Sequence, residues 1–218
     1  MLLKLLQKEF ILELRRKAVI TGIGLYLGSI VFICYLTFKL GRLGISEATW
    51  SALFWLIILF SVINSVGKSF IGEKKGVSVY YYSIASAQLI IVSKIIYNTI
   101  LSIVLSIIGF VLFSLFISNP IQDLPLFLLT LILTSCGFSA SLTLMSAIAS
   151  KANNSNILMA VLSFPIIIAV LLMAIRITKN ALDGLERSTS FDELLNLFAI
   201  NCILTALAYI LFPYIWRS

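Results

Sequence analysis

The sequence predicts an all-α integral membrane protein with six transmembrane helices, in which residues 1–218 form a single transmembrane domain. The first observation is composition: 61% of the residues are hydrophobic and 11% are charged, whereas soluble domains carry about 25% charged residues. The second observation is pattern, because six separate apolar stretches reach the roughly 20 residues that a helix needs to cross a bilayer. These stretches are 18–38, 48–66, 95–118, 124–149, 157–175 and 194–214.

Residues 1–17, which precede the first span, have the pattern of an amphipathic helix. At helical spacing one side carries large apolar residues and the other carries basic residues. The two sides are Leu3, Leu6, Phe10 and Leu14, and Lys4, Lys8 and Arg15. We expect an interfacial helix lying in the headgroup layer; a short cytoplasmic tail is the alternative.

The spans themselves contain few special features. The first span holds the motif Gly24-x-x-x-Gly28, a spacing that lets two helix backbones approach closely. Short polar turns such as residues 119–123 separate the later spans, and the fifth span contains Pro165. A proline there predicts either a kink that acts as a gate or simple packing, with neighbouring helices satisfying the freed carbonyl. Residues 176–193 predict a longer polar loop before the last span.

The distribution of positive charge predicts the orientation. With the N-terminus inside, the inner segments hold eleven of the 16 Lys and Arg residues, and the outer loops hold five. The positive-inside rule then places both ends of the chain in the cytoplasm. Because the basic residues are divided among the ends of apolar segments, the net charge of +7 indicates membrane topology and no nucleic-acid partner.

The residue types in the spans argue against self-sufficient chemistry. As delimited above, no span contains Asp, Glu, Lys, Arg or His, whereas ion-coupled carriers usually have ionisable groups inside the membrane. We therefore expect any energy to come from another subunit. The chain has no histidine and no acid–base pair, so we expect no enzyme activity, no metal and no cofactor. Polar residues such as Asn98 predict interhelical hydrogen bonds in preference to a substrate site.

Residues 67–94 form the only long polar interruption. Gly67-Lys68-Ser69 imitates the end of a phosphate-binding loop, but Val62 stands where the first glycine is needed. The tyrosine-rich part suits a protein interface or the headgroup layer equally well. Residues 85–93 predict a short helix in the membrane plane, which would serve as a handle for an external ATPase. An ordinary loop with tyrosines anchored at the interface is the alternative.

Four further motifs stand out: Phe70-x-x-Glu73-x-x-Gly76, the run Tyr80, Tyr81 and Tyr82, Ser93-Lys94-Ile95-Ile96-Tyr97-Asn98, and Leu162-Ser163-Phe164-Pro165-Ile166. On these motifs, and over essentially its whole length, the chain resembles the haem exporter protein B family, the membrane subunit of the ABC-type complex in cytochrome c maturation and an ABC-2 type permease. The chain departs from the family where Ala87 follows Ser86 in place of the usual proline.

The resemblance implies a multi-pass subunit of the bacterial inner membrane whose short coupling helix, between the second and third spans, docks a separate ABC ATPase. It assigns ATPase docking to Phe70, Glu73, Gly76, Tyr80, Tyr81, Tyr82 and Lys94, and helix packing or gating to Asn98 and Pro165. The implied partners are the ATPase, a haem-handling membrane protein, a haem chaperone and a second copy of this chain. The alternatives are a scaffold that transports nothing and an ABC-2 type exporter of another substrate.

Overall fold

The computed structural model describes residues 2–15, 17–40, 44–67, 69–71, 85–152 and 155–217. The described residues form helices and no strands, and six of the helices are long and apolar enough to cross a membrane. The elements are α1 (Leu2–Arg15), α2 (Lys17–Cys34), the π-helix η1 (Tyr35–Leu40), α3 (Glu47–Val66), α5 (Ala87–Phe116), α6 (Leu124–Ala149), α7 (Ser155–Leu182), the 3-10 helix η2 (Arg187–Ser190) and α8 (Phe191–Arg217). The predicted fold class of six membrane-spanning helices is confirmed.

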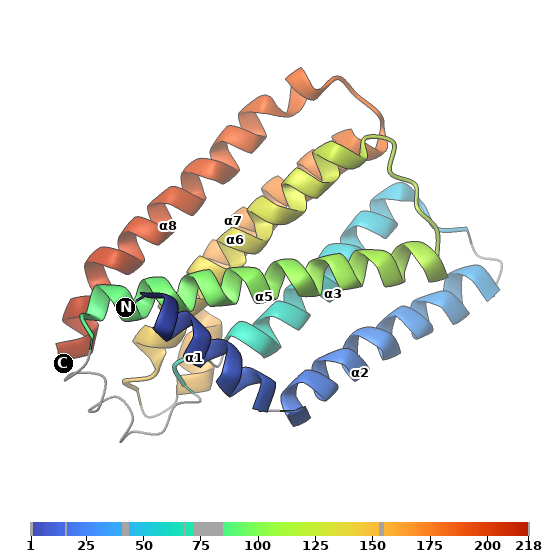
Figure 1. Ribbon diagram of the computed structural model, residues 1–218. Coiled ribbons are helices and arrows are strands. Elements are labelled where there is room, and N and C mark those ends of the chain that lie inside the picture. Colours follow the sequence, from blue (N-terminus) through green and yellow to red (C-terminus); the bar gives the residue numbers. More distant parts are fainter. Residues whose placement is uncertain are drawn as a thin grey trace.

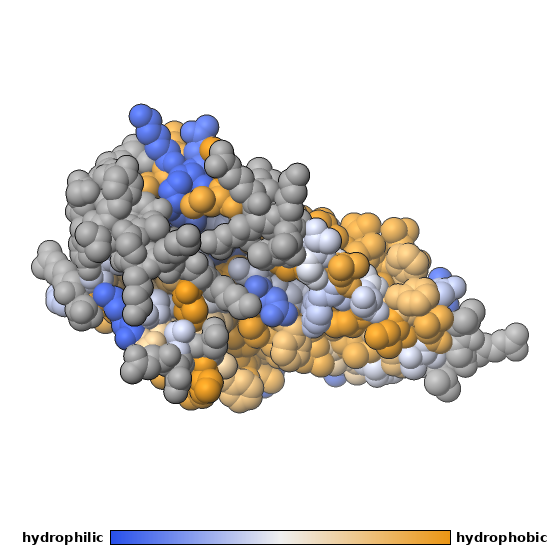
Figure 2. Space-filling model, turned by 90° about the horizontal axis from the view of Figure 1, so that it is seen from below, coloured by the Kyte–Doolittle hydropathy of each residue, from blue (hydrophilic) through white to orange (hydrophobic). Residues whose placement is uncertain are grey.

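The bundle is built around α6, which packs against α5, α7 and α8 and also contacts α3. Small residues allow α6 to occupy this central position. Many of its buried residues are Ser, Thr, Ala or Gly, which let neighbouring helices approach closely. The outer surface of the spans remains apolar, as the exposed Phe164, Leu195 and Ile203 illustrate. Figure 2 shows hydrophobic residues over most of the coloured surface, with hydrophilic residues gathered mainly at one end.

The two ends of the bundle are distinct. Both termini lie at one end, here called the near end, together with α1 and the start of α5 (Figure 1). The opposite, far end holds the turn between α5 and α6 and the turn between α7 and α8. Six crossings return the chain to the side on which it began, so the shared position of the termini follows from the count of spans.

An aromatic cluster fills the bundle between α3, α5 and α6. Trp50 and Phe54 stack at 5.4 Å, and both contact Phe113 and Phe127. The indole N–H of Trp50 is satisfied, because it donates to the Ser118 carbonyl at 2.9 Å. The cluster is therefore a packed core element.

Two of the helices extend well beyond their predicted spans. The helix of the third span, α5, begins at Ala87, eight residues before the expected start of the span, so residues 87–93 are its first turns and do not form a separate in-plane helix. At the far end α7 continues to Leu182, and the expected polar loop shrinks to residues 183–186 followed by η2. The 30 residues of α5 extend about 45 Å, which exceeds the roughly 30 Å hydrocarbon core. Hydropathy marks only the part of each helix that lies in lipid.

The far end is closed by compact turns. Asp123 caps α6 by accepting a hydrogen bond from the Leu126 N–H at 3.2 Å, and Gly184 ends α7 with a φ of +63°. A bond of 3.1 Å from the Leu185 N–H to the Asn180 carbonyl completes this terminus, in the pattern for which glycine is favoured. The sequence Asp183-Gly184 is thus a helix end.

Candidate functional site

The long polar interruption begins at the near end, where its described residues 69–71 are hydrogen-bonded to the helices. We call these three residues the loop root. The Ser69 N–H donates to the carbonyl of Val66, the last residue of α3, at 2.9 Å. The Phe70 N–H donates to the Ser146 hydroxyl of α6 at 3.1 Å. The loop root is therefore tied to α6 through its backbone.

Lys94, in the third turn of α5, is the charged residue at the centre of this site. Its side chain is 2% exposed, and its ammonium group donates to the Ser69 carbonyl at 3.0 Å. The same group lies 3.4 Å from a carboxylate oxygen of Glu9 and 4.8 Å from the centroid of the Phe70 ring. A buried ammonium requires such partners, because desolvation of an isolated charge costs several kcal/mol. Lys94 thus joins α5 to the loop root and to α1.

Glu9 supplies the negative charge. It lies 2.7 Å from the Lys8 ammonium in addition to its contact with Lys94. Burial raises the pKa of Glu9, but the charges and hydrogen bonds of Lys94 and Lys8 outweigh burial, so the pKa lies below its usual value. The carboxylate is therefore ionised at neutral pH. The neighbouring Phe10 ring meets the Tyr97 ring edge-on at 4.9 Å, so α1 docks on α5 through both charge and aromatic packing.

Asn98 lies one turn beyond Lys94 on α5. Its amide donates to Thr143 of α6 at 2.7 Å and to the Ser69 hydroxyl at 3.1 Å. At 2% exposed, it makes the interhelical hydrogen bonds expected of a packing residue. Asn98 therefore ties the loop root to both helices.

Asn98 also begins a regular series of polar contacts between α5 and α6. The next pairs are Ser102 with Ser139 at 2.8 Å and Ser106 with Ser135 at 3.1 Å. Each step is four residues on both helices, which run in opposite directions. We call these three contacts the polar ladder, and it connects the loop root to the middle of the bundle.

Phe70 anchors the loop root on α8. Its side chain is 6% exposed, and its ring lies 5.2 Å from Phe212, which in turn lies 5.3 Å from Trp216. The loop root therefore contacts α5, α6 and α8 directly and α1 through Lys94. A displacement of the loop root would therefore change its contacts with four helices.

The structure places only part of the predicted docking set. Phe70 and Lys94 come together at the loop root, where both side chains are buried and hold the segment in place. Their assignment to ATPase docking stays a prediction. Glu73, Gly76, Tyr80, Tyr81 and Tyr82 lie outside the described residues. Sequence reasoning missed Glu9 and Ser146; the signal available for Glu9 was an acid in a basic helix, together with a lysine at the start of an apolar run.

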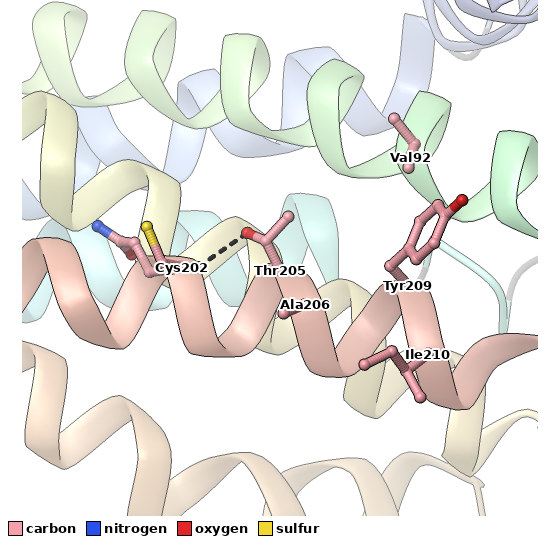
Figure 3. Close-up of a pocket in the computed structure, with 7 residues that line it drawn as sticks. Val92, Cys202, Thr205, Ala206, Tyr209 and Ile210 are labelled. Carbon is pink, nitrogen blue, oxygen red and sulfur yellow. Dashed lines mark hydrogen bonds between the residues drawn. The ribbon is translucent and has the colours of Figure 1, made fainter.

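An open groove of about 520 Å³ lies between α5 and α8. Figure 3 shows Val92 facing α8, which contributes Cys202, Thr205, Ala206, Tyr209 and Ile210. Tyr209 is 50% exposed, so the groove faces outward from the bundle. The Thr205 hydroxyl donates to its own helix, to the Asn201 carbonyl at 2.8 Å, and the lining carries no charged residue. The groove has the features of a lipid-facing surface.

The proline of the fifth span, the glycine motif of the first span and the cysteines lie away from the loop root. Pro165 lies inside a continuous α7 with its ring exposed. Gly24 and Gly28 lie on an outward face of α2, where a Cβ would meet no atom within 4 Å, so this motif does not pack against any described residue. Of the three free cysteines, Cys34 is buried, Cys136 is half-buried and Cys202 is exposed. In the described part of the chain, no three His, Cys, Asp or Glu residues gather to hold a metal ion.

Comparison with known proteins gives one clear result. The family model described as CcmB protein matches residues 1–211, which is nearly the whole chain. No curated protein matches the sequence. The matched range includes α1, the loop root, the polar ladder and most of α8.

Proposed function

This chain belongs to the CcmB protein family, and from that membership we propose that it couples ATP hydrolysis by a separate ATPase subunit to haem delivery, or to release of a haem-loaded chaperone. The family makes the chain a membrane component of the ABC haem exporter system of cytochrome c maturation. The observation that carries the coupling proposal is the loop root, which is fastened to α5, α6 and α8. A partner that moves the loop would therefore move the bundle.

We propose that the near end faces the cytoplasm of a bacterial inner membrane. The segments of the near end hold eleven basic and three acidic residues, for a net charge of +8. Those of the far end hold five basic and six acidic residues, for a net charge of −1. The positive-inside rule supports this orientation, which places the loop root where a cytoplasmic ATPase can reach it.

Residues 72–84 are proposed as the docking surface, with Glu73, Gly76 and Tyr80 to Tyr82 facing the ATPase. Tyrosine supplies a large contact area and a hydroxyl at modest entropic cost, and Glu73 adds charge for orientation. Phe70 and Lys94 hold the base of this surface, because both are buried against the helices. The complex is proposed to contain two copies of this chain, two of the ATPase, a haem-handling membrane protein and a haem chaperone.

Co-purification and turnover test docking and coupling separately. We expect Glu73→Ala combined with Tyr81→Arg to abolish co-purification of the ATPase, since it removes a charge and places another in the contact. Asn98→Leu should leave co-purification intact but reduce the effect of this subunit on ATPase turnover. Tyr209→Phe is the matched control, because it alters an exposed tyrosine on α8 away from the loop root.

Three results would overturn parts of the proposal. Unchanged binding by the Glu73 and Tyr81 variant would remove the docking assignment. ATPase turnover that is the same with and without this subunit would instead favour a scaffold that transports nothing. Turnover that responds to the subunit but not to haem would favour an exporter of another substrate.

A further inference from the structure

Helix α1 has two different faces. The face toward the bundle consists of partly buried residues, among them Leu2, Leu5 and Glu9. The opposite face exposes apolar and basic or neutral polar side chains. These are Leu3 at 78% exposure and Ile11 at 48%, together with Lys4 and Gln7. The outward face therefore has no packing partner within the described part of the chain that covers its apolar residues.

The position of α1 limits what can cover this face. Figure 1 shows α1 crossing the near end of α5 at a steep angle, close to the start of α2. Because α5 is longer than the hydrocarbon core is thick, we expect its near-end turns, on which α1 packs, to extend into the headgroup layer. A helix at this depth meets lipid headgroups on its outward side.

The charges on α1 and at the near end indicate which kind of molecule covers the outward face of α1. Among the described side chains of α1, Glu9 is the acid, and it faces Lys94 of α5. Among its described side chains, the exposed face thus presents apolar groups beside Lys4 and no acidic group. The segments at this end of the molecule carry a net charge of +8. Figure 2 shows hydrophilic residues projecting at this end, next to hydrophobic ones. This combination complements an anionic membrane surface, with apolar side chains inserting and lysine ammonium groups meeting phosphates.

We propose that the outward face of α1 binds the anionic phospholipid headgroups of the membrane, and that the Glu9–Lys94 contact passes this attachment to the loop root. The second step follows from geometry, since Lys94 contacts both Glu9 and the Ser69 carbonyl. Fixing α1 against the membrane therefore fixes the base of the long polar segment. Lipid binding does not depend on an ATPase, so its failure and the failure of the proposed function are distinguishable.

Amide hydrogen exchange of the full chain in vesicles tests the proposal. The test would compare vesicles of phosphatidylcholine with vesicles of equal parts phosphatidylcholine and phosphatidylglycerol. Protection of residues 2–15 should rise in the anionic vesicles by about fivefold for each lysine that reaches the surface. The increase should shrink at high salt, which screens exposed charges. Exchange in α8 should be the same in both.

Three variants decide where the effect arises. Lys4→Gln and Leu3→Gln should each reduce the increase, and both should fold, because these side chains are exposed. Lys151→Gln is the matched control, since Lys151 is an exposed lysine at the same end outside α1. Equal protection of α1 in both kinds of vesicle would overturn lipid binding. An equal loss in the Lys151 variant would overturn its assignment to α1.

Glu9→Gln tests the coupling step. With the native chain, protection of residues 87–94 should rise together with that of α1 when anionic lipid is present. In the Glu9 variant, protection of α1 should still respond to lipid, while residues 87–94 should no longer respond. A response of residues 87–94 that persists in this variant would overturn the link through Lys94.

Discussion

At the near end Lys94 is 2% exposed and faces Glu9, whereas at the far end Arg187 is 64% exposed and forks onto Asp123 at 2.7 and 3.0 Å. The far pair has the better geometry, and the hydrogen bond from Arg187 holds the pKa of Asp123 below its usual value. Water and salt nevertheless screen an exposed pair. The near pair is longer but largely removed from water, where loss of one partner is costly. Burial, and not distance, decides which pair matters for stability.

The two ends also differ in what their pairs support. The far-end pair joins two compact turns that already have a capping aspartate and a glycine terminus. The near-end pair supports the loop root, from which the long polar segment departs. We therefore expect the near end to be the energetically sensitive one.

The largest expected effect is that of Glu9→Gln. Removing the carboxylate that faces the buried Lys94 should cost about 3 kcal/mol of unfolding free energy. Chemical unfolding in mixed micelles measures this cost, with Arg187→Gln as the control that should change little. Adding Lys94→Met to the Glu9 variant should recover most of the loss, because the buried charge is then absent. A loss as large in the Arg187 variant would break the comparison.

Acidification should produce a smaller loss at the same place. Because the pKa of folded Glu9 lies below its ordinary value of 4.5, the stabilisation is fully present above that value. It is lost as the pH falls through the depressed pKa of the folded state. Hydrogen exchange of α1 should therefore accelerate below about pH 4.5 in the native chain, but not further in Glu9→Gln. Acid-independent exchange of native α1 would contradict the assignment.

Asn98→Leu should cost about 2 kcal/mol, since two membrane hydrogen bonds of roughly 1 kcal/mol each are lost. Ser106→Ala is the matched control in the same ladder, because it loses one hydrogen bond far from the loop root. Exchange of residues 69–71 should accelerate in the Asn98 variant alone. Equal acceleration in both variants would mean that the ladder acts as a unit and that Asn98 has no special role.

The smallest expected effect is at the far end. Gly184→Ala should cost about 1 kcal/mol, because the φ of +63° is unfavourable for a residue with a Cβ. The new Cβ would also meet the Gln122 side chain, which is flexible enough to move aside. Thermal unfolding should show this loss, while ATPase coupling should remain unchanged. A defect of ATPase coupling in this variant would indicate that the far end communicates with the near end.

The sequence was sufficient for the six spans, because length and hydropathy are local properties. It misplaced the start of α5, since the segment around Ser93 and Lys94 is polar enough to resemble a loop, yet tertiary partners hold it in a helix. The pairing of Lys94 with Glu9 joins residues 85 positions apart. No local pattern specifies such a contact. Phe70 was expected at a partner surface for its motif, but its aromatic ring packs on Phe212.

The polar ladder has a consequence for how α5 can move against α6. Its pairs repeat every four residues on both helices, so an axial shift of four residues, about 6 Å, would place Asn98 opposite Ser139 and Ser102 opposite Ser135. Two of the three contacts would then re-form with new partners. A shift of half that distance would break all three. The ladder therefore favours discrete positions of α5 relative to α6 over continuous sliding.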